Sequence, residues 1–131
     1  MKTLPILTAL ALLSACTTTQ PGPLTLAGTS WRITQIDGSI PAAPDKARLS
    51  FEADRISASV GCNGMGGAYH LEGDRLIAGP LIATRMFCDG PVWGQEQAVG
   101  ALLAAAPKLG RKGITLHLES SGHSLEAVRA E

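Results

Sequence analysis

The sequence lacks the clustered positive charge that nucleic-acid binding requires. Its 11 lysines and arginines are scattered, they are balanced by 11 aspartates and glutamates, and no basic run forms. A nucleic-acid interface needs positive charge gathered on one face or in one segment. The composition therefore excludes nucleic acid as the expected partner.

A long hydrophobic run is also missing. The most apolar stretch, Leu4 to Leu13, is far shorter than the roughly 20 residues that a membrane-spanning helix requires. With Lys2 before it and small residues after it, this stretch is typical of the core of a cleaved signal peptide. The letters LSAC that follow, ending at Cys16, resemble the lipobox of bacterial lipoproteins. That resemblance implies cleavage before Cys16 and lipidation of this cysteine.

The N-terminal segment therefore predicts a membrane anchor. We expect residues 1–15 to be the signal peptide, and Thr17 implies, by the same resemblance, sorting to the outer membrane with the domain facing the periplasm. Several acyl chains on one residue give firm anchoring. Residues 16–25 are polar and contain proline and glycine, which predicts a flexible tether before a single small domain over 26–131. An ordinary signal peptide with an incidental cysteine is the alternative.

Cysteine is scarce, with three residues in the chain. Once Cys16 is lipidated, Cys62 and Cys88 remain, and an even pair in a small domain of an oxidising compartment favours a disulfide. Two free thiols and a zinc site are the alternatives. The zinc alternative is weak because no C-x-x-C or H-x-x-x-H spacing accompanies the pair. We expect no metal and no other cofactor.

Most of the domain alternates apolar and polar residues at the two-residue period of β-strands. In the segment 114–119, for example, Ile114, Leu116 and Leu118 form the expected core face. Short turn segments join six of the strands into three predicted hairpins. The expected strands are SWRITQI (30–36), ARLSFE (47–52), RISASV (55–60), AYHLE (68–72), RLIAG (75–79), ITLHLE (114–119) and SLEAVR (124–129).

One segment has helical spacing instead. Residues 91–107 place Val99, Leu102 and Leu103 on one face, with Pro91 and Pro107 as boundaries. Strands in series with one helix inserted before the last hairpin predict an α+β domain with a mostly antiparallel sheet.

Motifs for catalysis are absent. The glycine-rich letters GCNGMGG precede a strand pattern and lack the lysine of a phosphate-binding loop, and no G-x-S-x-G occurs. His70 and His117 are expected to alternate outward from their strands, and His123 lies in a turn. Glu52 and Asp54 occupy a hairpin end, where solvated charge is ordinary. We predict no catalytic residue and no enzyme activity.

The strongest motif is GCNGMGGAY, over residues 61–69. Together with LAGTSWRI, LIATRMFCD and the helix that contains Glu96, it resembles the META domain, or HslJ-like, family of bacterial lipoproteins. The resemblance implies an antiparallel, barrel-like sheet with one helix, a link to heat shock or antibiotic tolerance, and no catalytic residue to carry over. Its most specific positions are Gly61, Cys62, Asn63, Gly67, Tyr69, Thr84, Met86 and Cys88.

We interpret GCNGMGGAY as a structural staple. Its four glycines, at 61, 64, 66 and 67, predict a bend between two strands in backbone conformations closed to other residues. Asn63 is expected to hydrogen-bond within its own turn, and Tyr69 to begin the next strand.

Four apolar residues near the motif have two interpretations. Met65, Met86, Phe87 and Trp93 are either core packing or an apolar site for a lipid tail or an apolar peptide. With the anchor, they favour a non-enzymatic lipoprotein that binds an envelope protein, peptide or lipid in stress or antibiotic tolerance. The alternatives are a pilot-like carrier of such a ligand, and an inhibitor of a periplasmic lysozyme or protease that uses the loop DGSIPAAPD (37–45).

Overall fold

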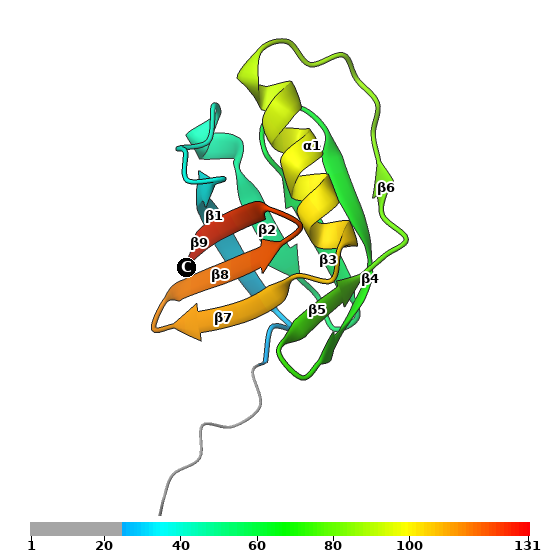
Figure 1. Cartoon of the computed structure of the whole chain (residues 1–131), viewed down its shortest axis with the longest axis vertical. Helices are drawn as coiled ribbons and strands as arrows, with labels where there is room; N and C mark the ends of the chain where they lie inside the picture. Colours follow the sequence, from blue (N-terminus) through cyan, green and yellow to red (C-terminus); the bar gives the residue numbers. More distant parts are fainter. Residues whose placement is uncertain (1–24) are drawn as a thin grey trace, which may run out of the picture.

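The computed structural model describes residues 25–131, so the predicted signal peptide and the lipidation of Cys16 lie outside the described residues. Eight strands form a closed antiparallel barrel in the order β3-β2-β1-β9-β8-β7-β5-β4, with β3 paired to β4, and β6 pairs with β4 outside this ring (Figure 1). The elements in chain order are β1 (Thr29–Ile36), the 3-10 helix η1 (Pro44–Lys46), β2 (Arg48–Phe51), β3 (Arg55–Ser59), β4 (Gly64–Glu72), β5 (Arg75–Ala78), β6 (Ile82–Ala83), α1 (Pro91–Ala104), β7 (Lys108–Lys112), β8 (Thr115–Ser120) and β9 (His123–Arg129).

The predicted fold class, an antiparallel barrel-like sheet with one helix, is confirmed. The three predicted hairpins are β2–β3, β4–β5 and β8–β9, each antiparallel. Two strands were not predicted. The first, β6, has two residues, and the second, β7, buries only Leu109, so neither shows an alternating apolar pattern. As a result α1 is followed by β7 before the last hairpin.

Alternation places one apolar face of each main strand inside the barrel. The prediction for Ile114 was wrong, because this residue lies in the turn before β8 and is 66% exposed. At one end of β1 the indole of Trp31 is covered by the guanidinium groups of Arg111 and Arg129, each 5.6 Å from the ring. The largest fully buried side chains include Trp31, Phe51, Ile33, Leu49, Ile56, Leu76, Leu102, Leu103, Leu116, Leu118 and Leu125.

The helix α1 completes the core. It begins at Pro91, which suits the first helical position, and it packs against β9, β5, β1 and β8. Figure 1 shows α1 between β1 and β9 on one side and the β6 segment on the opposite side. Val99, Leu102 and Leu103 are buried, as the helical spacing predicts. No helix within residues 25–131 is long and apolar enough to span a bilayer.

Candidate functional site

A disulfide joins the connection between β3 and β4 to the residues that precede α1. The Sγ atoms of Cys62 and Cys88 are 2.00 Å apart, and the bond spans 26 positions of sequence. A bridge of this span stabilises a fold by about 3.5 kcal/mol in the chain-entropy model. Of the three states left open by the sequence, the structure has the disulfide. It fixes one end of the segment that runs from β6 to α1.

Asn63, beside this disulfide, is buried and uses its whole side-chain amide. Its Oδ1 accepts hydrogen bonds from the Thr84 hydroxyl (2.9 Å) and the Met86 backbone N–H (2.8 Å). Its Nδ2 lies 3.1 Å from the Met86 carbonyl oxygen and 3.1 Å from Oε2 of Glu96. The prediction that Asn63 bonds within its own turn was therefore wrong. The side chain instead joins three segments that are distant in sequence.

Glu96 is the buried acceptor of this network. Its side chain is 4% exposed, its Oε1 accepts the backbone N–H of Asn63, and its Oε2 accepts from the Asn63 amide. Burial of a carboxyl group is costly unless hydrogen bonds compensate. Because no cation among residues 25–131 forms an ion pair with Glu96, the amide groups of Asn63 provide that compensation.

The two sulfur atoms and the Glu96 carboxylate also form the one cluster in the described residues with metal-ligand spacing. The three ligand atoms lie within 4.8 Å of one another. Zinc binds cysteine as the thiolate, and the sulfur atoms here are bonded to each other. The arrangement therefore acts as a structural junction and offers no thiolate to a metal.

The prediction of a glycine-rich bend was wrong for most of the motif. The strand β4 begins at Gly64 and contains Tyr69, and among the four glycines only Gly61 has a positive φ, of 144°. A Cβ atom on Gly67 would lie 2.6 Å from the carbonyl oxygen of Pro80, and one on Gly66 would lie 2.8 Å from that of Ile56. These two glycines are thus required by close backbone approach rather than by a turn.

Tyr69 of β4 contacts the β2–β3 hairpin through its hydroxyl group and its ring. Its hydroxyl donates to the carbonyl oxygen of Glu52 (2.9 Å), and its ring meets that of Phe51 edge to face, with centroids 5.1 Å apart. Burial raises the pKa of the Tyr69 hydroxyl, and repulsion from Asp54 adds to the effect. The hydroxyl is a structural donor at neutral pH.

None of the three histidines belongs to a catalytic triad within the described residues. Each lies close to a surface carboxylate: His70 to Glu72 (3.0 Å), His117 to Glu119 (3.5 Å), and His123 to Asp37 (2.9 Å). A triad needs a nucleophile beside the histidine, and no serine, threonine or cysteine side chain is hydrogen-bonded to these rings. The outward orientation predicted for His70 and His117 agrees with their exposed side chains.

A hollow of about 930 Å³ lies next to the junction, between α1 and β6, and is called here the α1–β6 hollow. Met65 forms part of its floor, Met86 and Phe87 stand on one wall, and Trp93 stands on the helix wall. These are the four apolar residues singled out from the sequence. Its lining comprises Asn63, Met65, Leu81, Ala83, Thr84, Arg85, Met86, Phe87, Trp93, Glu96, Gln97, Gly100, Ala101 and Ala104.

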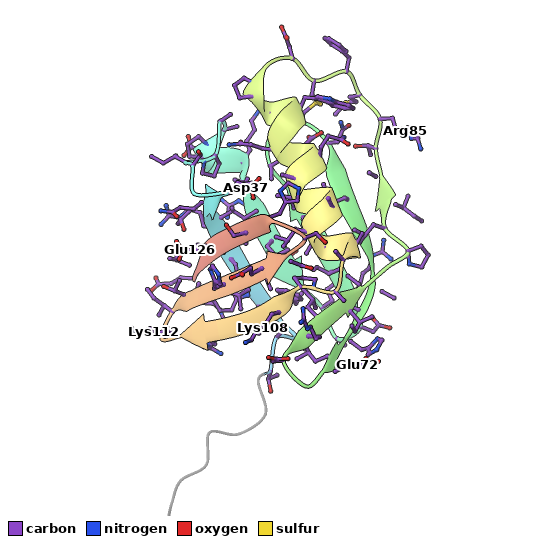
Figure 2. The ribbon with its side chains drawn as sticks, in the orientation of Figure 1. Asp37, Glu72, Arg85, Lys108, Lys112 and Glu126 are labelled. Carbon is purple, nitrogen blue, oxygen red and sulfur yellow. A yellow bond between two sulfur atoms is a disulfide. The ribbon has the colours of Figure 1, made fainter. Side chains whose placement is uncertain are left out.

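Exposure decides between the two interpretations of these side chains. Phe87 is 91% exposed, Met86 58% and Trp93 50%, so core packing does not explain these three. Met65 is partly buried and packs against the core. The segment that carries β6 and Arg85 stands apart from α1 (Figure 2). Phe87, Met86 and Trp93 therefore form an exposed apolar surface and are not part of the core.

The sequence did not reveal the role of Glu96. Glu96 lies 33 positions from Asn63, and little in the helical pattern distinguishes it from an exposed glutamate. The one signal in the helical pattern was that Glu96 lies three positions before the buried Val99, and therefore on the same face of the helix.

Two comparisons with solved structures support the fold alone. An NMR structure with 22% sequence identity covers 79% of this chain and 90% of its own, with a TM-score of 0.69. An NMR structure of a protein from Burkholderia xenovorans is 24% identical over 99% of both chains, with a TM-score of 0.65. No curated protein matches the sequence.

The family model described as META domain matches residues 24–131. The chain belongs to the META domain family. Five of the positions that carried the resemblance cluster at the junction, where the start of β4, the β6 segment and α1 of the META domain meet. Cys62, Cys88, Asn63, Thr84 and Met86 all take part in it.

Proposed function

We propose that this META domain is a non-enzymatic binding module of the bacterial envelope, lipid-anchored to the outer membrane at Cys16 and acting in stress or antibiotic tolerance. Its ligand would be an extended, apolar segment of an envelope protein, bound in the α1–β6 hollow. The observation that carries the proposal is the group of exposed apolar side chains beside the edge of β6, which pairs with no further strand of residues 25–131.

The apolar lining supports binding rather than a purely structural role. Phe87 and Trp93 are large aromatic side chains that remain in water, and contiguous exposed apolar surface marks interaction sites. Met65 and Met86 add flexible thioethers, which adapt to side chains of different shape. A hollow of this kind suits an apolar ligand whose detailed sequence varies.

The edge of β6 favours a peptide over a lipid tail. β6 ends the strand order, and the Thr84 N–H donates to the Gly64 carbonyl on the β4 side. Alternation along an antiparallel ladder therefore turns the N–H and C=O groups of Ala83 and Arg85 away from β4. An added strand would satisfy these groups, as in β-augmentation. A lipid tail would leave them unpaired.

The junction holds this wall in place before any ligand arrives. Both backbone polar groups of Met86 bond to Asn63, and the neighbouring Cys88 is covalently fixed to Cys62. A wall that is already ordered loses less conformational entropy on binding. The disulfide and the Asn63 hydrogen bonds therefore order one wall of the proposed ligand site.

The experiment follows the fluorescence of Trp93. The chain has two tryptophans, and Trp31 is fully buried, so only Trp93 should respond to a ligand in the hollow. We expect a peptide of alternating valine and threonine to shift the emission to the blue with saturation. Trp93→Phe should remove the response and leave the emission of Trp31 unchanged.

Two controls test the strand-edge mode. A peptide with proline at every second position lacks the N–H donors and should not bind, and Ala83→Pro removes the matching donor on β6, where an edge strand tolerates proline. Binding of palmitate in preference to the alternating peptide would instead support the lipid carrier. No saturable response to either probe would overturn the proposal.

A second candidate function rests on the loop between β1 and η1. Ile40 is 74% exposed at this loop, and Gln95 of α1 fixes its backbone by accepting from the Ala42 N–H (2.8 Å) and donating to the Ile40 carbonyl (3.2 Å). A fixed loop with an exposed apolar side chain suits insertion into a hydrolase cleft. Inhibition of a lysozyme or protease that Ile40→Asp abolishes, and that Ile114→Asp on the exposed turn preserves, would support it.

A further inference from the structure

A second hollow, of about 500 Å³, lies on the outer face of β2, β3 and β4, beside β6. We call it the arginine hollow and define it by Arg48 and Ser50 of β2 and by Arg55, Ser57 and Ser59 of β3. It adjoins the α1–β6 hollow, with which it shares Met65, Ala83 and Thr84, but its arginines and serines do not line that hollow. Gly64 and Gly66 contribute to the arginine hollow.

Strand register gathers hydrogen-bond donors on this face. Arg48 is paired with Ser59, and Ser50 with Ser57, so their side chains stand next to one another. On the neighbouring strand Arg32 is directly opposite Arg48. Like charges in such a cross-strand pair repel each other and destabilise the sheet. A bound anion would relieve this repulsion.

Within residues 25–131 these donors have no hydrogen-bond or ion-pair partners. Across the described residues, the side chains of Arg48, Arg55, Ser50, Ser57 and Ser59 form none of the hydrogen bonds or ion pairs of the structure, and the nearby hairpin carboxylates, at positions 52 and 54, form no ion pair with either arginine. Guanidinium groups are donors without acceptor capacity. The arginine hollow is therefore suited to an acceptor-rich, negatively charged group.

Gly66 lies at the base of this hollow and is itself buried. A Cβ atom at this position would lie 2.8 Å from the carbonyl oxygen of Ile56, 3.5 Å from Oγ of Ser57 and 3.7 Å from Nη2 of Arg55. The glycine therefore lets the backbone of β4 approach β3 closely, and it places the Ser57 hydroxyl and the Arg55 guanidinium next to each other above it.

We propose that the arginine hollow binds a phosphate group. A phosphate offers several acceptor oxygens in a tetrahedral arrangement, and arginine pairs with such oxygens in bidentate fashion. The serine hydroxyls supply further donors from neighbouring strands. Inorganic phosphate and the phosphodiester of a lipid headgroup share this chemistry. The proposal is independent of the peptide assigned to the α1–β6 hollow.

The test uses the full chain with Cys16→Ser, which prevents lipidation, and follows backbone amide and arginine Nε–H resonances by NMR. Sodium phosphate is added at constant ionic strength, with sodium chloride as the matched salt. We expect saturable shifts at Arg48, Arg55 and Ser57 with phosphate and none with chloride. The double substitution Arg48→Gln with Arg55→Gln should weaken binding by about tenfold or more, since both charge-assisted contacts are lost.

Matched substitutions separate the site from general charge effects. Arg85→Gln changes the charge of an exposed arginine in the other hollow (Figure 2) and should leave the affinity within about twofold. Ser57→Ala, which preserves every charge, should still weaken binding by a few-fold, as expected for one lost hydrogen bond. The amide spectrum of each variant reports whether it is folded.

A second titration distinguishes a lipid headgroup from free phosphate as the ligand. It uses glycerophosphoglycerol, the deacylated headgroup of phosphatidylglycerol. Tighter binding of this diester than of inorganic phosphate assigns the site to a lipid headgroup. The reverse order assigns it to free phosphate. Linear shifts with both compounds, equal shifts with chloride, or unchanged affinity in the double variant would each overturn the proposal.

Discussion

Asn63 uses both ends of its side-chain amide, and its bonds reach the β6 segment and α1. An alanine at this position would remove the side-chain partners of the Met86 backbone groups and of the buried Oε2 of Glu96, whereas Oε1 would keep its bond from the backbone N–H of residue 63. Unsatisfied buried groups cost about 1–3 kcal/mol each. The amide is thus worth more to the fold than a turn asparagine would be.

Replacement of this amide gives the first prediction. Asn63→Ala should lower the free energy of unfolding by roughly 2–4 kcal/mol, measured by urea denaturation. Gln97→Ala removes an amide of similar type from an exposed position of α1 and should change it by less than about 0.5 kcal/mol. Equal effects of the two substitutions would show that the buried network contributes little.

Asp37 controls a second set of bonds, at the exposed end of the β8–β9 hairpin. Its Oδ1 accepts the Ser124 N–H (2.9 Å), and its Oδ2 lies 2.9 Å from Nδ1 of His123. Partial burial of the carboxylate acts to raise its pKa, but the hydrogen bond from Ser124 and the interactions with His123 outweigh it, so the pKa is lowered from 3.8. The ionised form is therefore the one that the folded state favours.

The second prediction concerns acid stability. A lowered folded-state pKa stabilises the fold above the unfolded value of 3.8, and this contribution is lost as the pH falls through the lowered value. Asp37→Asn should be less stable than the original chain at about pH 6, and the difference should shrink below about pH 3.8. Urea midpoints at several pH values measure it. A difference that stays constant with pH would contradict this role for the carboxylate.

At the scale of elements, the strands with the clearest alternation were the ones that the sequence predicted. β2, β3 and β8 each bury alternate residues, and their hairpins follow from short turns. β7 was missed because its sequence KLGRK has one apolar residue. Its place in the barrel depends on pairing with β8, which no local pattern encodes. The junction was predicted in part, since its cysteines are visible in sequence but Glu96 is brought there by the fold.

The glycines of β4 show why the bend was predicted wrongly. A glycine in a sequence indicates either a positive φ or the close approach of another backbone. The sequence pattern alone favoured a positive φ. Gly67 needs the second, because the Pro80 carbonyl approaches it, whereas Gly64 has nothing within 4 Å of its virtual Cβ atom. Two glycines of one strand therefore have different tolerances.

The third prediction compares these two positions. Gly67→Ala should destabilise the protein by about 2 kcal/mol or more, because the methyl group must displace backbone. Gly64→Ala should be neutral or slightly stabilising, since glycine weakens a strand interior. Thermal unfolding of both variants provides the measurement. Similar melting temperatures would mean that the segment after β5 moves aside without cost.

At the scale of the whole molecule, the barrel and the helix depend on each other. The strands β5 and β7 share one residue pair, Arg75 with Lys108, supported by backbone bonds from Leu76 to Pro107 and from Leu109 to Asp74. This is the shortest ladder in the ring. The helix α1 packs against β5 next to it and buries Leu103 in the shared core.

The last prediction follows from this shared core. If α1 completes the barrel, the helix and the strands unfold together, and Leu103→Ala should lower the free energy of unfolding by about 2–5 kcal/mol. In a Trp93→Phe background the fluorescence reports only on Trp31 inside the barrel, while far-UV circular dichroism reports on secondary structure. The two transitions should coincide in urea before and after the substitution. Ala101→Ser, on the exposed face of α1, should leave both midpoints almost unchanged. A loss of the circular-dichroism signal at lower urea than that of Trp31 would mean that the barrel stands without α1, and the helix wall of the α1–β6 hollow would then be free to move independently.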